Sequence, residues 1–130
     1  MDFDPTPEQQ ALLRMVADFA RAEVVAAQAR METENRFPYE TWRAWSDLGM
    51  AGAVIPETYG GAGLDTLSYL LCVEELAAVS QSFAQIWQIH SLVSLMIAEL
   101  GTEAQKTAWL PAYARGDKTP AFALTEAGAG

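Results

Sequence analysis

Signals for the start of a helix recur along this chain, and they constrain its fold more than any other feature. Four side chains that can cap a helix each precede apolar residues spaced three and four apart: Thr6, Asp65, Ser82 and Thr102. A Gln stands three residues after each of the three hydroxyl residues, which is the spacing of a capping box. Pro7 adds a residue favoured at the first helical position. The sequence therefore predicts an all-α fold.

The caps and the apolar periodicity predict a bundle of five to six helices. The expected segments, with their caps, are Thr6–Met31, Tyr39–Leu48, Asp65–Val79, Ser82–Leu100 and Thr102–Arg115. Core positions are expected in each, among them Trp42 and Trp45 in the second and Leu67 and Leu70 in the third.

A glycine-rich connection separates the second and third helices. Gly49 is suited to the left-handed residue that ends a helix, and Gly60 and Gly61 allow a close approach of the backbone. Apolar residues such as Ile55 indicate that the segment is ordered. A phosphate-binding loop would need a preceding strand and a Gly-Lys-Ser/Thr ending, so we expect a tight turn between helices.

Composition excludes several classes of function. The 130 residues carry 8 Lys and Arg against 17 Asp and Glu, a net charge of −9, and 51% are apolar. That is the composition of one folded domain, and its charge disfavours nucleic acids and anionic membranes as partners. The single Cys72 excludes an internal disulfide and is expected to be buried, and no metal site is expected.

The chain shows no sign of a membrane or secretory segment. Its most apolar stretch, residues 83–100, is interrupted by polar side chains, and its first residues contain neither a basic segment nor an apolar run. We therefore expect no membrane span and a cytoplasmic location.

The last residues differ in character from the rest. Residues 121–125 are short and apolar and lead into a run of alanine and glycine, a pattern typical of a strand followed by a loop. One strand cannot form a sheet, so its partners are expected outside these 130 residues. The sequence predicts a helical domain over residues 1–118 and the start of a β-domain over 119–130.

The helix expected over residues 82–100 is apolar almost all round, which is typical of a central helix. His90, the only histidine, lies on its apolar stripe without a neighbouring cysteine or carboxylate, so a core position is favoured over a ligand or an acid–base role. Gln85, Gln88 and Leu92, spaced three and four apart, share another face of this helix. From the residues alone, that face meets either solvent, which is favoured, or a pocket with a polar mouth.

The order and spacing of these segments resemble the N-terminal helical domain of the acyl-CoA dehydrogenase flavoproteins. The motifs that carry the resemblance are Thr6–Gln9, Gly49–Gly63 with its Ile-Pro-Glu-Thr-Tyr-Gly-Gly core, Glu74–Ala77, His90–Leu92, Leu100–Lys106, Trp109–Pro111 and Phe122–Glu126. The resemblance covers nearly the whole chain but only the first third of such proteins, and it implies a helical bundle that ends in an orphan strand.

The resemblance also implies site residues. Phe122, Leu124 and Thr125 match positions that pack on or hydrogen-bond the flavin ring of FAD, and Gly130 matches a position near the flavin and its pyrophosphate. The family's usual proline after the Thr-Glu pair is Ala127 here. Three residues match positions that line the acyl-chain pocket, which shifts the preference for their face from solvent to pocket: Gln85, Gln88 and Leu92.

The activity implied is α,β-desaturation of an acyl-CoA thioester, with electrons passed to an electron-transfer flavoprotein or another acceptor by a homotetramer. The resemblance places the catalytic base in a later part of such proteins, so no catalytic residue is expected here. Two alternatives stay open. One is a flavin oxidase or monooxygenase of the same fold, in which His90 takes part, and the other is a non-enzymatic helical interaction module.

Overall fold

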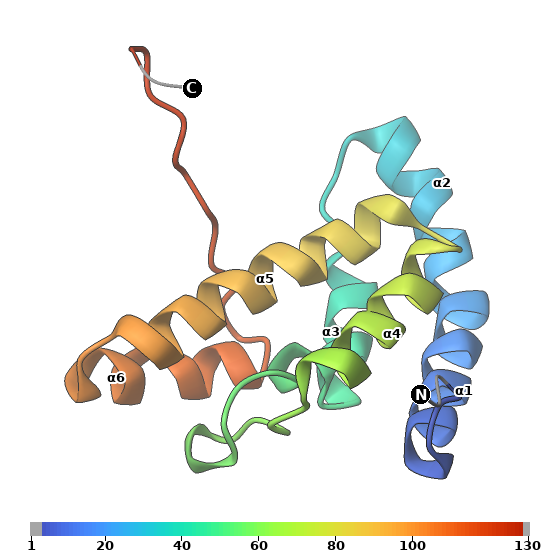
Figure 1. Ribbon diagram of the computed structural model, residues 1–130. Helices are drawn as coiled ribbons and strands as arrows, with labels where there is room; N and C mark the ends of the chain where they lie inside the picture. The colour runs from blue at the N-terminus through green and yellow to red at the C-terminus, as the bar shows by residue number, and fades with distance from the viewer. Residues whose placement is uncertain (1–3, 129–130) are drawn as a thin grey trace.

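The computed structural model describes residues 4–128 and is an assembly of helices (Figure 1). Its helices are α1 (Pro7–Phe19), α2 (Val25–Glu34), α3 (Tyr39–Asp47), α4 (Thr66–Ala77), α5 (Gln81–Leu100) and α6 (Glu103–Ala114). A π-helical turn, Ala20–Val24, joins α1 to α2, and 3-10 turns occupy Met50–Gly52 and Glu57–Tyr59. The all-α prediction is confirmed.

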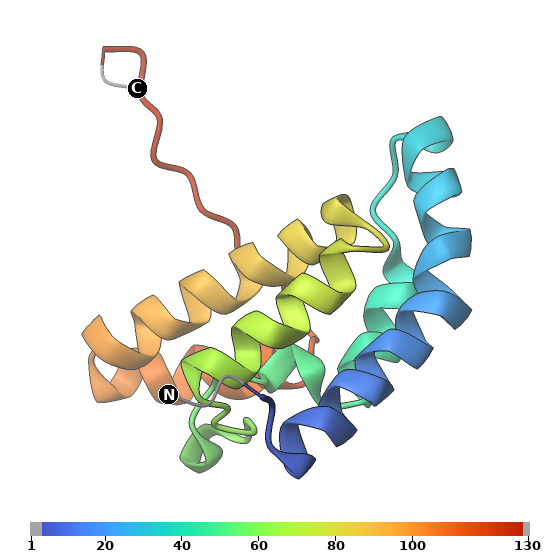
Figure 2. The same cartoon turned by 45° about the vertical axis from the view of Figure 1, so that its right-hand side comes forward.

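The helices pack side by side around α4 and α5. α1 packs on α4, α4 on α5 and α5 on α6, and the α4–α5 and α5–α6 pairs are antiparallel hairpins with short turns (Figures 1 and 2). α5 is the longest helix and runs across the molecule, with α3 behind it. The central place expected for this helix is therefore confirmed.

The helix caps follow the sequence with one exception. Thr6 and Thr102 form complete capping boxes with Gln9 and Gln105, and Asp65 caps α4. The prediction of Ser82 as the cap of α5 is wrong, because Ser80 takes that position. Ser80 has extended backbone dihedrals and its Oγ accepts a hydrogen bond from Phe83 N at 3.2 Å.

The first predicted helix is longer and less regular than expected. It runs to Glu34 rather than Met31 and ends at Asn35, whose φ is +48°. The wide π turn in its middle keeps Ala20 and Val24, both fully buried, on the face that meets the core. Apolar spacing alone does not distinguish such a turn from the α-helix around it.

The main core is built around aromatic rings from three helices. Trp45 packs its ring 5.1 Å from that of Trp87 and 4.9 Å from that of Phe19, and Phe83 lies 6.2 Å from Trp45. Trp42 is 4% exposed, so both tryptophans of α3 are core residues as predicted. The buried thiol expected at Cys72 is also confirmed.

Two residues of α4 face outward against expectation. Leu67 is 60% exposed and Leu70 51% exposed, whereas Ser68 between them is buried. The hydroxyl of Ser68 donates to Asp65 Oδ2 at 2.6 Å and accepts from Gln9 Nε2 at 3.1 Å, so a polar contact with α1 occupies the inward position. The apolar pattern gave no sign of this pairing.

The glycine-rich connection is an ordered turn, as predicted. Gly49 adopts φ +81°, and three hydrogen bonds tie residues 62–64 to the carbonyls of Gly52, Ile55 and Ala53. A Cβ on Gly61 would collide with the carbonyl of Ile55, so the backbones touch here. The fully buried Ile55 then meets Leu110 of α6 in a second, smaller core.

The chain leaves the helical body after α6. Residues 119–128 run outward from the far side of α5 (Figures 1 and 2), and residues 121–125 form no strand in the described part of the chain. A strand gains its hydrogen bonds only from a neighbour, which these residues do not have. None of the helices within residues 4–128 is long and apolar enough to span a membrane.

Candidate functional site

Three grooves follow the length of α5, and four of the sequence-predicted site residues line them: Gln85, Gln88, Leu92 and Phe122. We name them by the elements that form them. The exit groove, about 480 Å³, is lined by Met31, Phe37, Ser82, Gln85, Ile86, Ile89, His90, Thr119, Pro120 and Ala121. The α4–α5 groove, about 250 Å³, is lined by Tyr69, Gln88, Ile89, Leu92 and Leu95. The α5–α6 groove, about 280 Å³, is lined by Val93, Met96, Ile97, Leu100, Gly101, Gln105, Trp109, Ala121 and Phe122.

The three residues expected to line an acyl pocket lie in two of these grooves. Gln88 and Leu92 share the α4–α5 groove, whereas Gln85 lines the exit groove, and Ile89 borders both. All three side chains are exposed, Leu92 by 43%. In this structure the face is therefore accessible and hollowed, so it can accept a ligand or another part of a longer chain.

The residues expected to hold a flavin lie on the segment that leaves the body. Phe122 is 43% exposed and lines the α5–α6 groove, and Leu124 is 72% exposed and Thr125 is exposed beyond it. Gly130, expected near the pyrophosphate, lies outside the described residues. The structure thus places Phe122 against α5 and leaves Leu124 and Thr125 free of the helices.

These residues suit a flavin ring. A ring needs an apolar surface to pack on and hydrogen-bond groups at its edge, and the two apolar side chains and the Thr125 hydroxyl supply both. Residues 121–125 belong to no helix or strand of the described chain, so their backbone N–H groups are not used in a ladder. The described residues hold no group of three His, Cys, Asp or Glu side chains suited to a metal ion.

His90 lies where α5 meets the connection after α3. Its side chain is 1% exposed, its Nε2 lies 3.0 Å from the carbonyl oxygen of Ala51, and its ring stands edge-on to Trp42 with the ring centroids 4.9 Å apart. Beside it, Trp87 Nε1 donates to the carbonyl of Met50 at 2.7 Å. Two side chains of α5 thus hold two consecutive carbonyls, which confirms a core position for this histidine.

The protonation of His90 follows from that burial. Removal from water lowers its pKa from 6.5 to about 4, so the ring is neutral at pH 7. If Nε2 carries the hydrogen and donates it to Ala51, Nδ1 is an acceptor, and it forms no hydrogen bond within the described residues. His90 is itself one of the residues that line the exit groove.

The carboxyl groups with a shifted pKa are all poor candidates for a base. Hydrogen bonds stabilise the ionised forms and lower the pKa of Asp65 through Ser68, of Glu103 through Tyr59 and of Asp117 through Arg115. A carboxylate with a lowered pKa accepts protons less readily, so none of the three is suited to proton abstraction.

The sequence analysis missed the walls opposite α5. Tyr69 of α4 faces Gln88 and Leu92, and Phe37 and Pro120 face Gln85, although each lies far from α5 in sequence. Local periodicity carries no information on such pairs. Only the packing of α4 and of the chain's exit against α5 brings them together.

Comparisons with known proteins agree with this arrangement. A family model described as "Acyl-CoA dehydrogenase, N-terminal domain" matches residues 6–117. The short-chain specific acyl-CoA dehydrogenase of Clostridium acetobutylicum is 42% identical over all of this chain and 35% of its own length. The chain spans about a third of the length of such relatives.

Solved structures share the fold over the whole chain. Butyryl-CoA dehydrogenase of Megasphaera elsdenii matches with a TM-score of 0.87 and 36% identity, over 100% of this chain and 35% of its own. A chain in a structure described as an electron transferring flavoprotein of Acidaminococcus fermentans matches with a TM-score of 0.92 and 34% identity, over 100% of this chain and 34% of its own.

Proposed function

Because the chain belongs to the acyl-CoA dehydrogenase family, we propose that it is the N-terminal domain of an FAD-dependent enzyme that desaturates acyl-CoA thioesters. The observation that carries the proposal is the exposed segment with Phe122, Leu124 and Thr125, which extends away from the helices next to the groove between α5 and α6. We place the domain over residues 1–118 and the start of a β-domain over 119–130, because α6 ends just before this boundary.

The segment supplies one side of the flavin site. Phe122 and Leu124 pack on the flavin ring and Thr125 donates its hydroxyl to the ring's polar edge, with Gly130 close to the pyrophosphate. When bound, FAD takes up the hydride that leaves the β-carbon of the acyl group. The residues of this chain bind and orient the ring, and their apolar surface helps exclude water.

The α4–α5 groove supplies the acyl site. Gln88 and Leu92 face Tyr69 across about 250 Å³, and Gln85 adds a polar group on the neighbouring side of Ile89. A small groove with the amide side chain of Gln88 in its wall favours a short acyl group, in keeping with the short-chain specific relative. We place the carboxylate that removes the α-proton outside these 130 residues, because the family resemblance puts it in a later part of such proteins, and the three carboxyl groups with a lowered pKa here are weak bases.

We further propose a homotetramer that works in the cytoplasm and passes its electrons to an electron-transfer flavoprotein. The exposed apolar side chains of α5, among them Leu95, Met96 and Leu100, support burial against further protein. The flavoprotein structure that contains a chain of this fold supports the choice of acceptor.

One observation favours a second function. His90 presents an unpartnered Nδ1 near the exit groove, as an acid–base residue of a flavin oxidase or monooxygenase would need. Its lowered pKa and its bond to Ala51 favour a structural role instead. The dehydrogenase remains the first candidate.

The test is the visible absorption spectrum of the full gene product, recorded anaerobically before and after addition of acyl-CoA thioesters of increasing chain length. We expect a yellow protein that a short-chain thioester bleaches. A yellow protein that no thioester bleaches would favour the oxidase or monooxygenase. A colourless protein that takes up no FAD would overturn the proposal and leave an interaction module.

A matched pair of variants tests the assigned residues. Thr125→Ala removes a hydroxyl from the proposed flavin site, and Thr107→Ala removes the hydroxyl of another exposed threonine, in α6. We expect weaker FAD binding, by roughly fivefold, in Thr125→Ala alone, since one hydrogen bond to a ligand contributes on the order of 1 kcal/mol. Equal affinity in the two variants would remove Thr125 from the site.

A further inference from the structure

Five residues hold the chain where it leaves the helical body, and we name them the exit clamp: Trp42, Arg43 and Ser46 of α3, and Gly116 and Asp117 after α6. We propose that α3, through the exit clamp, is the positioning element of the flavin-binding segment: it fixes the direction in which residues 118–125 depart. The effect of the exit clamp on FAD binding rests on the proposed function, because only a segment that contacts the flavin ring would need to be positioned by α3.

The clamp begins with the turn that ends α6. Gly116 adopts φ +70°, its N–H donates to the carbonyl of Tyr113 at 2.9 Å, and the N–H of Asp117 donates to that of Ala112 at 3.0 Å. This pair of bonds around a left-handed glycine is a Schellman motif. The motif reverses the chain sharply, but it does not by itself fix the path of the residues that follow.

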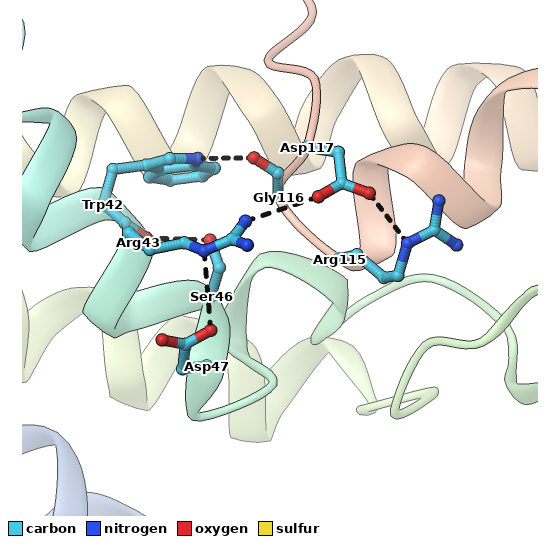
Figure 3. Close-up of polar contacts among 7 residues, drawn as sticks. All are labelled: Trp42, Arg43, Ser46, Asp47, Arg115, Gly116 and Asp117. Carbon is cyan, nitrogen blue, oxygen red and sulfur yellow. Dashed lines mark hydrogen bonds and ion pairs between the residues drawn. The ribbon is translucent and has the colours of Figure 1, made fainter.

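α3 fixes that path by contact with Gly116. Trp42 Nε1 donates to the Gly116 carbonyl at 3.3 Å, and Ser46 lies against the glycine's Cα (Figure 3). A Cβ on Gly116 would lie 2.6 Å from Ser46 Cβ and would overlap Ser46 Oγ. Ser46 cannot turn aside freely, because its hydroxyl donates to the Trp42 carbonyl at 2.8 Å. The turn therefore fits only one way against α3.

Charges hold the next residue. The carboxylate of Asp117 is shared between two arginines, with Arg43 Nη1 at 3.3 Å from one oxygen and Arg115 Nε at 2.8 Å from the other (Figure 3). Arg43 is itself held by Asp47 at 3.8 Å. Exposed pairs of this kind contribute little to stability, so we assign them to orientation. Through Asp117, these ion pairs connect Arg43 of α3 to Arg115 at the end of α6.

The flavin segment begins directly after the clamp. Pro120 and Ala121 line the exit groove, and Ala121 with Phe122 lines the α5–α6 groove. Only four residues lie between Asp117 and Phe122, so a rotation at the clamp moves Phe122 out of its groove. Displacements of about 1 Å can weaken a positioned interaction by up to about 100-fold.

The experiment measures FAD affinity of the full gene product in a set of glycine variants. Gly116→Ala adds a methyl group against Ser46. Gly60→Ala is the matched control, because Gly60 also has a positive φ, +85°, but an added Cβ meets no atom within 4 Å. The double variant Ser46→Gly/Gly116→Ala removes the overlap between the added methyl group and Ser46. Trp42→Phe keeps an aromatic ring but removes the N–H that donates to the Gly116 carbonyl.

We expect Gly116→Ala to raise the dissociation constant for FAD roughly tenfold or more, Gly60→Ala to leave it within about twofold, and the double variant to recover most of the loss. Trp42→Phe should weaken binding in the same direction. The inference is overturned if Gly116→Ala binds FAD like the unaltered protein, or if Gly60→Ala is equally impaired, since general destabilisation would then explain the loss.

A second readout separates the clamp from the flavin. In the 130-residue chain, NMR relaxation should show the amides of residues 118, 119, 121 and 122 as rigid as those of α6, and Gly116→Ala should make them mobile while α1 and α4 stay unchanged. If the unaltered protein binds no FAD but this result holds, the proposed function fails and the clamp stands. If these four amides are mobile in the unaltered chain, the clamp is overturned whatever the FAD result.

Discussion

At the scale of single residues, His90 is a polar group used to join two elements. Its Nε2 meets the carbonyl of Ala51 while the rest of the ring lies among aromatic side chains, 1% exposed. A buried acceptor left without a partner costs free energy, and the hydrogen bonds from His90 and Trp87 satisfy two carbonyls of a turn that belongs to no long helix. The histidine therefore supports the connection on which the second core depends.

The burial of His90 predicts a pH dependence of stability. Its pKa is about 4 in the folded chain against 6.5 when exposed, so between these values the unfolded chain binds a proton that the folded chain does not. Stability is thus complete above pH 6.5 and falls as the pH drops toward 4. Between pH 7 and 5 we expect a loss on the order of 2 kcal/mol in urea unfolding.

The control is His90→Asn, which cannot titrate. Between pH 7 and pH 5, the free energy of unfolding of this variant should change much less than that of the unaltered protein, even if the variant is less stable at pH 7. The groups that titrate with a lowered pKa, among them Asp65, Glu103 and Asp117, lose their contribution only at more acidic pH. Parallel curves for the two proteins would show that His90 is not the group responsible.

At the scale of elements, α1, α4, α5 and α6 each begin after a side chain that accepts a hydrogen bond from a free backbone N–H, and that side chain marks where the helix starts. For α5 the cap is Ser80, and the helix therefore starts at Gln81. This register directs Phe83, Trp87 and His90 into the core and leaves Gln85, Gln88 and Leu92 on accessible faces.

Alanine variants of the two serines test that register. Ser80→Ala removes a buried hydroxyl that accepts from Phe83 N, and should cost about 1 kcal/mol of unfolding free energy. Ser82→Ala changes an exposed side chain in the first turn and should cost less than about 0.5 kcal/mol. Thermal unfolding followed by circular dichroism measures both. If Ser82→Ala lowered the free energy of unfolding more than Ser80→Ala, Ser82 would be the N-cap of α5 instead.

At the scale of the whole molecule, the residues that stabilise the fold are separate from the segment that we propose binds flavin. The aromatic core and the smaller core of Ile55, Leu110 and Ala114 lie between helices, whereas most side chains of residues 119–128 are exposed. The helical body thus acts as a support, and the exit clamp connects it to the segment that we propose binds the cofactor. This division supports the proposed boundary near residue 118.

Truncation after residue 118 tests the division. The shortened chain should keep its helical circular dichroism and unfold within a few degrees of the 130-residue chain, because little buried apolar area is lost. Leu110→Ala in the same shortened chain opens a cavity at a fully buried site and should cost about 2–5 kcal/mol. A truncated chain that unfolds at room temperature would place residues 119–128 within the folding unit.

The sequence predicted most of the helices and fewer of the contacts between them. The caps at Thr6, Asp65 and Thr102 depend on neighbours three residues away, so they were legible in one dimension. Leu67 was placed inward wrongly, because Ser68 found partners on another helix. The assignment of flavin and acyl residues came from the family resemblance, and their roles remain predictions.

By itself, then, the sequence determined the helical class, the ordered glycine connection and the family, since each is encoded in short-range patterns of caps, spacing and motifs. Tertiary structure decided which wall faces α5, how Gln85 is separated from Gln88, and that α3 holds the chain's exit at Gly116. Trp42 and Gly116 are 74 residues apart. No local pattern links such positions, because their contact exists only once the helices have packed.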